Sequence, residues 1–444
     1  MTAPQRAIRG RLLTFLGDPA VAGAAASHRC IEDGLIVVAD GRIARVGEAA
    51  ALLPALPAGL PIDDHRGCLV MPGLIDLHVH YPQTRVIASY GTQLLEWLQR
   101  YTFPAERRFA DPAHAAAAAR FFCDELLRNG TTTAAVYCTV HPQSAEALFA
   151  EAARRDMRLI AGKVLMDRGA PADLTDTAQR GYDESKRLIA CWHGRGRLRY
   201  AVTPRFALTS SEAQLEAAGA LMREHPDVLL QTHLDENRAE IAAVKAQFPW
   251  ARHYVDVYDR FGLVGARSLL GHCIHLEDGE RARLSAAGAV AVFCPSSNLF
   301  MGSGLFDLAR TRDPRLPLRT GLATDVGGGS SYSMLRTAAD AYKVLQLQGQ
   351  SLSALEAFYM MTLGNARAAA LDHAIGALEE GREADLVVLD SRATPAMAHR
   401  MEAVEGDLAE ELFVLMTLGD DRAVRATYVA GEPAVPPATA APDA

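Results

Sequence analysis

The segment Met71-Pro-Gly-Leu-Ile-Asp-Leu-His78-Val-His80 decides the fold class of this 444-residue chain. It is typical of an apolar strand entered through Pro-Gly, and the alternation along a strand places the side chains of His78 and His80 on one face. Two imidazoles in an apolar strand need polar partners to offset their lost hydration, so an unpartnered pair of core histidines is the less favoured alternative. The pair predicts part of a metal-dependent catalytic site.

Strand-like runs continue after this segment and alternate with Ala/Leu/Glu-rich stretches such as 112–128 and 211–224, which are long enough for crossover helices. Eight such strands joined by helices are typical of a (β/α)8 TIM barrel, an α/β fold, which we expect from about residue 73 to 375. The predicted strands are 74–80, 131–137, 158–165, 198–204, 228–234, 268–273, 289–294 and 319–325.

Both chain ends have a different pattern, typical of short β-strands. An apolar run ending at Gly41 is followed by an alternating segment at 42–47, and strand-like runs return at 384–390 and 426–431. We therefore expect residues 1–72 and 376–432 to form one small β-sandwich domain. The Pro/Ala-rich tail, residues 433–444, should be mobile.

Composition excludes several classes of protein. A hydrophobic fraction of 49% and a charged fraction of 22% are ordinary for a globular enzyme, and a net charge of −8 does not suit nucleic-acid binding. The sequence has no run of 18 apolar residues, and its first residues are not apolar enough for a signal peptide. Seven cysteines without a C-x-x-C pair are typical of a reducing compartment, so we expect a cytoplasmic protein that does not span a membrane.

Three further predicted strands end in residues that could complete a site with His78 and His80. These strands end in or near His233, His272 and Asp325. The carboxyl ends of barrel strands meet at one mouth, where the active sites of this fold lie. Neutral imidazoles with one carboxylate suit Zn²⁺ or Fe²⁺ and leave a position for water.

The chain resembles the amidohydrolase superfamily and, within it, the guanine deaminases. The resemblance covers nearly all of the predicted barrel. It rests on PGLIDLHVHYPQ (72–83), LLEWLQRYTFPAE (94–106), NGTTTA (129–134), GKVLMD (162–167), TPRF (203–206), THLDEN (232–237), GHCIHL (271–276), CPSSN (294–298) and TDVGGGSSYSML (324–335). The activity that it implies is hydrolytic deamination of guanine to xanthine and ammonia, in purine catabolism, by a homodimer.

The resemblance also implies a single metal ion. Two-metal members of the superfamily bridge their ions with a carboxylated lysine from the fourth strand, and the fourth predicted strand here has no lysine. Lys163 lies on the third strand, and we interpret it as structural. The implied cofactor is one Zn²⁺ per chain, with Fe²⁺ as the alternative, held by His78, His80, His233 and Asp325.

The remaining implied roles concern catalysis and binding of a small purine. Glu236 corresponds to a proton shuttle, His272 to the histidine that contacts the attacking water or the substrate, and Asp325 can accept the proton of that water. Arg205 and Gln83 supply hydrogen-bond donors for the purine, and Glu236 also contacts it. Aromatic contacts are expected from Phe206, Trp97 and Phe103.

Three alternatives stay open at this point. The chain could be a related deaminase that acts on 8-oxoguanine, adenosine-like compounds or triazines, although Arg205 and the Glu236-Asn237 pair favour guanine. A two-metal cyclic-amide hydrolase is the second alternative. The third is a non-catalytic barrel that binds a partner, which the complete set of expected metal ligands disfavours.

Overall fold

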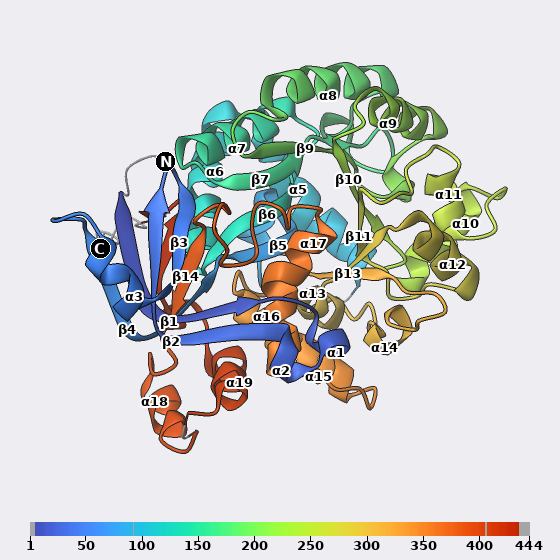
Figure 1. The fold of residues 1–444 in the computed structure, drawn as a ribbon. Coiled ribbons are helices and arrows are strands. Elements are labelled where there is room, and N and C mark those ends of the chain that lie inside the picture. The colour runs from blue at the N-terminus through green and yellow to red at the C-terminus, as the bar shows by residue number, and fades with distance from the viewer. Residues whose placement is uncertain (1–4, 92, 405, 435–444) are drawn as a thin grey trace, which may run out of the picture.

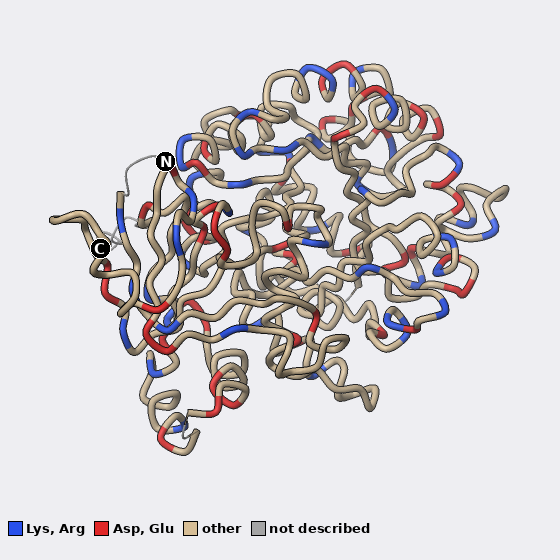
Figure 2. The backbone as a smooth tube through the Cα atoms, in the orientation of Figure 1, with Lys and Arg blue, Asp and Glu red and all other residues tan. Residues whose placement is uncertain are grey.

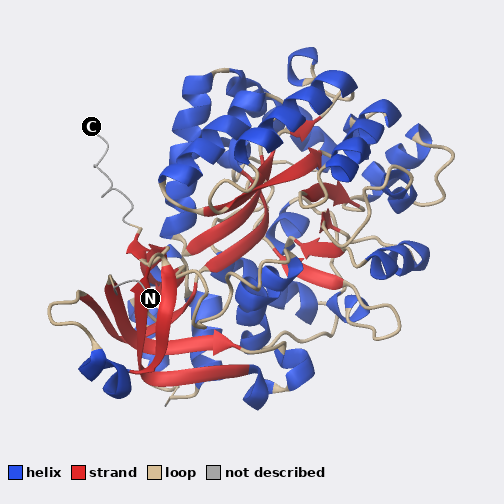
Figure 3. Ribbon diagram, turned by 45° about the horizontal axis from the view of Figure 1, so that its top comes forward, coloured by secondary structure: helices blue, strands red, loops and turns tan. Residues whose placement is uncertain are grey.

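The computed structural model describes residues 5–91, 93–404 and 406–434. It has two parts: a barrel surrounded by helices and a sheet built from both ends of the chain (Figure 1). Figure 3 shows the sheet beside the barrel, with most helices gathered around the barrel strands. The predicted fold class, a (β/α)8 barrel with a β-structure formed by the two chain ends, is confirmed.

All strand pairs of the barrel are parallel, and neighbouring strands follow the order of the chain. Their apolar residues face the barrel interior and the surrounding helices, which makes them nearly continuous buried runs. The strands are β5 (Leu74–His80), β6 (Thr131–Tyr137), β7 (Arg158–Gly162), β8 (Val164–Leu165), β9 (Leu198–Pro204), β10 (Leu229–Leu234), β11 (Ser268–His272), β12 (Val290–Phe293) and β13 (Arg319–Leu322).

The barrel closes between its first strand and the segment that follows its last strand. The backbone N–H of Asp325 donates to the carbonyl oxygen of His78 at 2.9 Å, and the N–H of His80 donates to that of Val326 at 2.7 Å. The closure therefore places Asp325 beside both histidines of β5.

Three predicted strands, 74–80, 131–137 and 198–204, have the observed bounds, whereas the others are shorter or interrupted. The strand predicted at 158–165 is interrupted at Lys163, whose backbone N–H donates to the side-chain hydroxyl of Tyr200 at 3.3 Å. The last predicted strand ends early, because Thr324 turns its N–H to the carboxylate of Asp76 at 3.1 Å.

Helices cover the outside of the barrel. The helices predicted at 112–128 and 211–224 are present, with Asp111 and Ser211 as N-caps that accept hydrogen bonds from the first turn. Apart from two short helices after β5 that lie over the mouth, the helices between β5 and β14 are α6 (Pro112–Arg128), α7 (Pro142–Arg154), α8 (Ala178–Trp192), α9 (Glu212–Glu224), α10 (Arg238–Gln247), α11 (Tyr254–Asp259), α12 (Asp278–Ala287), α13 (Pro295–Phe300), α14 (Leu308–Thr311), α15 (Met334–Gln346), α16 (Ala354–Tyr359) and α17 (Asn365–Ala368), of which α17 packs into one end of the barrel.

The inside of the barrel is filled by small and medium apolar side chains from alternate strand positions. Ile75, Leu77, Ile160 and Leu269 belong to this cluster, together with residues from α17 and the segment after it. One end of the barrel is therefore packed by the chain after α17. The opposite end, at the carboxyl ends of the strands, is the end where a functional site can form.

Seven strands from the two chain ends form one sheet. Its order is β16-β15-β14-β4-β1-β2-β3, with β1 and β4 parallel and the other neighbours antiparallel. The strands are β1 (Arg6–Phe15), β2 (His28–Ala39), β3 (Arg42–Glu48), β4 (Ile62–Pro72), β14 (Leu386–Leu389), β15 (Val424–Val429) and β16 (Glu432–Pro433), with α1 (Pro19–Ala22), α2 (Ala24–Ser27) and α3 (Ala49–Leu52) in the connections.

This sheet buries a cluster on its own inner face. Ile36 and Ile43 from the N-terminal strands pack in one cluster with Leu386 and Tyr428 from the C-terminal strands. The backbone N–H of Ala384, just before β14, donates at 2.9 Å to the carbonyl of Gly41, which lies between β2 and β3. The strands predicted to form a sandwich belong to one seven-stranded sheet rather than to two separate sheets.

The C-terminal part also contains helices that the sequence analysis did not predict. They are α18 (Pro395–Met401) and α19 (Leu408–Leu418), inserted between β14 and β15, and Leu412 and Leu415 of α19 join the large core cluster of the barrel. Of the tail predicted to be mobile, Pro433 lies in β16, and residues 435–444 are outside the described residues.

Charged residues of both signs are interspersed over the barrel helices and the terminal sheet (Figure 2). Buried ion pairs connect the two parts: Arg158 Nε donates to Glu383 Oε2 at 2.9 Å, and Arg197 Nη1 to Asp385 Oδ1 at 2.8 Å. In the part of the chain that the structure describes, no helix is both long and apolar enough to cross a membrane.

Candidate active site

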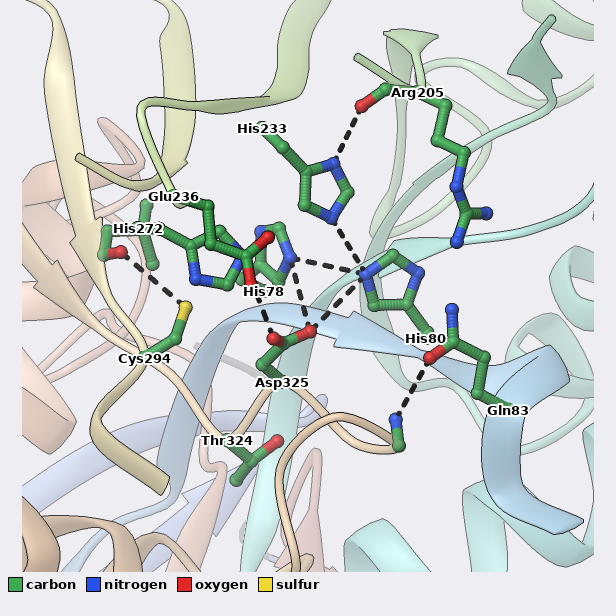
Figure 4. A network of polar contacts seen from close by, with 12 residues as sticks. His78, His80, Gln83, Arg205, His233, Glu236, His272, Cys294, Thr324 and Asp325 are labelled. Carbon is green, nitrogen blue, oxygen red and sulfur yellow. Dashed lines mark hydrogen bonds and ion pairs between the residues drawn. The ribbon is translucent and has the colours of Figure 1, made fainter. Parts of the chain in front are cut away.

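Four side chains from three separate places in the barrel meet at the carboxyl ends of the strands (Figure 4). His78 and His80 come from β5, His233 from β10, and Asp325 from the segment after β13. All four are at most 9% exposed. The alternation of β5 and the closure of the barrel therefore bring the predicted metal ligands together.

The donor atoms of these residues have the spacing of one coordination sphere. His80 Nε2 lies 3.2 Å from both His78 Nε2 and His233 Nε2. Asp325 Oδ1 lies 3.3 Å from both His78 Nε2 and His80 Nε2. Neighbouring donors of a tetrahedral site with bonds of about 2.0–2.1 Å lie about 3.3 Å apart. The residues present therefore fit a single divalent ion.

The protonation states of these four side chains, neutral imidazoles and an ionised carboxylate, are also those that metal ligands need. Nδ1 of His233 lies 2.6 Å from the backbone carbonyl of Arg205, which can only accept, so the proton sits on Nδ1 and Nε2 keeps its lone pair. Burial lowers the pKa of His78 and His233, and that of His80 to about 3. Burial opposes ionisation of Asp325, but the adjacent His78 and His80 outweigh it and hold its pKa well below the usual value.

Asp76, which the sequence analysis did not single out, ties the two sides of this cluster together. Its Oδ1 accepts from the backbone N–H of His78 at 3.2 Å and from that of Thr324 at 3.1 Å, and its Oδ2 accepts from the Thr324 hydroxyl. Asp76 is fully buried, and burial raises its pKa to about 6. The carboxyl group thus positions the residues that precede Asp325 against β5.

Glu236 and His272 lie on the other side of Asp325 from His80 (Figure 4). His272 Nε2 is 3.4 Å from Glu236 Oε2 and 3.7 Å from Asp325 Oδ2. The hydroxyl of Ser303 donates to Glu236 Oε1 at 3.0 Å. Burial, followed by the charge of Asp325, raises the pKa of Glu236 to about 8, so this carboxyl can hold a proton at neutral pH.

His272 is oriented by Asn298, the last residue of the CPSSN motif. Its Nδ1 lies 2.9 Å from Asn298 Oδ1, which can only accept, so Nδ1 carries the proton and Nε2 faces the site as an acceptor. The backbones of His272 and Asp325 lie in the left-handed region, with φ of 71° and 51°. Such strained conformations cluster at functional sites.

The predicted substrate-binding residues Gln83 and Arg205 lie next to each other on the His80 side of the site (Figure 4). Both contact Glu106, the last residue of the LLEWLQRYTFPAE motif, which the sequence analysis did not single out as a site residue. Arg205 Nη1 lies 2.8 Å from Glu106 Oε1, and Gln83 Nε2 donates to the same oxygen at 3.2 Å. An acidic residue in an apolar helical segment was the available signal for this buried triad.

A helical segment covers the mouth of the barrel. It consists of α4 (Leu94–Trp97), η3 (Leu98–Thr102) and α5 (Phe103–Arg107), and its apolar side chains form one cluster with Phe206. The indole N–H of Trp97 donates to the carbonyl of Ser89 at 3.2 Å. Trp97 and Phe206 line the site cavity, whereas the Phe103 ring faces the guanidinium of Arg205, 5.8 Å from its carbon.

The cavity between these residues has about 410 Å³ of empty space, including some that is open to solvent. It brings the metal-ligand cluster, the acid and the hydrogen-bond donors to one place. Its lining residues are His80, Gln83, Leu94, Trp97, Leu98, Arg205, Phe206, His233, Glu236, His272, Ser297, Met301, Asp325 and Gly328.

Comparison with known proteins shows the family of the chain. The model of the Amidohydrolase family matches residues 69–434, which span the barrel and the C-terminal strands of the sheet. The chain belongs to the amidohydrolase family. It is 49% identical over 407 residues to the guanine deaminase of Escherichia coli K12, with 92% of each chain covered.

Two solved structures extend the comparison of this amidohydrolase. That of E. coli guanine deaminase matches with a TM-score of 0.94 at 47% identity, over 97% of this chain and 99% of the other. That of guanine deaminase from C. acetobutylicum with bound guanine in the active site matches with a TM-score of 0.85 at 29% identity, over 96% and 99%.

Two other side chains bear on the metal count of this amidohydrolase. Lys163 is fully buried and its ammonium contacts Asp176 and, at 3.4 Å, Glu184, which supports a structural role. Cys294, which the sequence analysis did not assign, can reach a common point with His78, His272 and Asp325. Burial raises the pKa of its thiol well above the usual value, and the thiol donates to the carbonyl oxygen of Val292 at 3.5 Å.

Proposed function

We propose that this amidohydrolase is a guanine deaminase, which hydrolyses guanine to xanthine and ammonia. The observation that carries the proposal is that one cavity holds the donors of Gln83 and Arg205 on one side and the Glu236 and His272 pair on the other, with the metal-ligand cluster between them. The sequence and structural similarity to guanine deaminases supports it.

The metal site that we propose is mononuclear, held by His78, His80, His233 and Asp325. Zn²⁺ suits three neutral imidazoles and a carboxylate, and Fe²⁺ is the alternative. When bound, the ion supplies a Lewis acid that lowers the pKa of a water molecule and makes it a nucleophile near neutral pH.

The chain's own residues would then direct water to C2 of the purine. His272, with Nδ1–H committed to Asn298, offers Nε2 as an acceptor that orients the attacking water. Asp325 is anionic and can take a proton from that water through Oδ2, which faces His272 Nε2. Trp97 of the covering segment and Phe206 line the cavity and shield part of it from bulk water.

Glu236 would move the protons that deamination needs. Its carboxyl, whose pKa is raised by burial, would give a proton to ring N3 as the oxygen adds to C2. The proton that Asp325 took from the water would then pass through Glu236 to the exocyclic nitrogen, the C2–N bond would break and ammonia would leave, and the C2 hydroxyl would return a proton to Glu236 as the carbonyl forms. Water and guanine are thereby converted to xanthine and ammonia. The hydroxyl of Ser303 holds Oε1 of this carboxyl in place.

Purine recognition would come from Arg205 and Gln83. Guanine presents acceptors at O6 and N7, and both side chains offer N–H donors. Phe206 lines the cavity as a flat apolar surface for the ring, and Trp97 does so from the covering segment. Phe103 contributes indirectly, because its ring lies against the Arg205 guanidinium.

We place this reaction in purine catabolism, in the cytoplasm, in a homodimer with no nucleic-acid or membrane partner. The seven cysteines are all unpaired, which supports a reducing compartment. Light scattering of the purified protein tests the dimer.

The test of the proposed function is ammonia release from guanine, 8-oxoguanine, adenosine and a triazine, measured side by side, with metal content measured by elemental analysis. We expect guanine to give the highest kcat/KM, with one metal ion per chain. A higher kcat/KM for another compound would show that this compound, and not guanine, is the preferred substrate. Two ions per chain would favour the two-metal alternative, and no activity with a full metal complement would overturn the assignment.

A further inference from the structure

Glu106 is a fully buried carboxylate that the chemistry of the proposed reaction does not use. It lies on α5, in the covering segment, and not on a barrel strand. Its two oxygens accept from Arg205 Nη1 at 2.8 and 3.0 Å, and its Oε1 also accepts from Gln83 Nε2 at 3.2 Å. Its partners are thus the two side chains that line the cavity as donors for the purine.

These contacts determine how both donors are presented. Gln83 is held at both ends of its amide, because its Oε1 accepts from the backbone N–H of Gly327 at 3.4 Å while its Nε2 donates to Glu106. Arg205 uses Nη1 for Glu106, which leaves its other N–H groups for a ligand. The guanidinium also lies against the Phe103 ring, on the same helix as Glu106.

The charge of Glu106 matters as much as its position. Arg205 is 3% exposed, and an unpaired guanidinium at such a place would attract any anion that fits the cavity. The carboxylate of Glu106 cancels that charge within hydrogen-bond distance. A neutral purine would then bind to Gln83 and Arg205 at a place where Glu106 has cancelled the positive charge of Arg205.

We propose that Glu106 is a positioning residue that selects neutral over anionic purines, by orienting Gln83 and Arg205 and by neutralising Arg205. The inference rests on the proposed function, since it assumes that Arg205 and Gln83 bind the purine. Because Glu106 belongs to the covering segment and Arg205 follows β9, the donors are complete only when that segment is packed over the mouth.

The experiment compares wild type with Glu106→Gln and Glu106→Asp, measuring kcat and KM for guanine and inhibition by urate, a purine that is anionic at neutral pH. Glu106→Gln should raise KM for guanine by at least about 10-fold with a much smaller change in kcat, because a buried hydrogen bond between charged groups is lost. The inhibition constant for urate should fall by about 10-fold, because Arg205 is left as an unpaired cation.

Glu106→Asp separates the two roles, because it keeps the charge on a shorter side chain. We expect it to raise KM for guanine while urate inhibition stays near wild type. If Glu106→Gln does not fold, Glu106→Asp still tests positioning, and unchanged KM in that variant would overturn the proposal.

The matched control is Glu383→Gln, which also removes a carboxylate from a buried ion pair, with Arg158, where barrel and terminal sheet meet. It should lower the melting temperature and leave KM and urate inhibition unchanged.

A double-mutant cycle with Arg205→Gln gives a second readout. In the Arg205→Gln background, Glu106→Gln should change KM and urate inhibition by less than about a third of the change that it causes in wild type. Equal effects in both backgrounds, or a Glu106→Gln variant with wild-type KM and urate inhibition, would overturn the proposal.

The outcomes for the two proposals are distinguishable. A wild-type enzyme that does not release ammonia from guanine contradicts the proposed function. The role of Glu106 is then decided by calorimetric dissociation constants of guanine and urate for wild type and Glu106→Gln, where an unchanged ratio of the two constants refutes it.

Discussion

The two sides of the cavity are built differently. On one side, the wall that we propose to bind the metal, called the metal-ligand wall, consists of His78, His80, His233 and Asp325. The first three lie on barrel strands and Asp325 follows β13 by three residues, with donor atoms 3.2–3.3 Å apart. On the other side, the recognition wall consists of Gln83, Glu106 and Arg205. These come from η2 (Tyr81–Val86), α5 and the residue after β9, and their side chains are joined by hydrogen bonds.

Under the proposed function, this difference separates the residues that perform the reaction from those that select the substrate. Backbone hydrogen bonds of the barrel hold the metal-ligand wall, so its geometry depends on the fold as a whole. Side-chain contacts with a covering helix hold the recognition wall, so it can change without disturbing the barrel. Substitutions in the first wall should therefore reduce metal content and kcat, and substitutions in the second should mainly change KM.

The largest effect is expected in the metal-ligand wall. His80→Ala removes a nitrogen that lies 3.2 Å from both other imidazoles and 3.3 Å from Asp325, so metal content should fall to a small fraction and kcat/KM by about 10³-fold or more. Elemental analysis and initial rates check this. A matched control is His65→Ala in the terminal sheet, whose ring contacts Tyr428 at 2.7 Å, and which should leave the metal content unchanged. Full activity of metal-depleted His80→Ala would contradict the assignment of this wall.

An intermediate effect is expected for Glu236, the acid that lies across the metal-ligand wall from the recognition wall. Glu236→Gln keeps the shape of the side chain but cannot shuttle protons, so kcat should fall by about 10²–10⁴-fold with metal content near wild type. Ser303→Ala, which removes only the hydroxyl bond to Oε1, should cost about 1 kcal/mol, less than a 10-fold change. An unchanged kcat for Glu236→Gln in single-turnover measurements would remove Glu236 from the mechanism.

The smallest effect is expected in the segment that covers the recognition wall. Trp97→Phe loses the indole bond to the Ser89 carbonyl, worth about 0.5–1.5 kcal/mol, so KM for guanine should rise a few-fold with kcat unchanged. Trp250→Phe is the control, because it loses a comparable bond to Glu212 and Trp250 does not line the cavity. If Trp97→Phe reduces kcat and metal content together, the two walls are not separable.

Most of the metal-ligand wall could be predicted from local patterns. Alternation along β5 puts His78 and His80 on one face, and the carboxyl ends of parallel strands meet at one mouth, so His233, His272 and Asp325 could be grouped before their positions were known. The same reasoning predicted three strands with their observed bounds. It failed where a side chain replaced the strand pairing, as Tyr200 does at Lys163 and Asp76 does at Thr324.

By itself, the sequence determined the class of fold and the alternation that pairs the histidines and, through resemblance, predicted Gln83 and Arg205 as purine-binding residues, because these depend on neighbours a few positions apart or on recognisable motifs. Only the tertiary structure decided that Glu106 meets Arg205 across 99 positions, that Asn298 orients His272, that α19 packs on the barrel core, and that the barrel closes through Asp325 and Val326. Contacts of this kind depend on how distant segments pack together, and no local pattern of polarity specifies which buried carboxylate will face which donor.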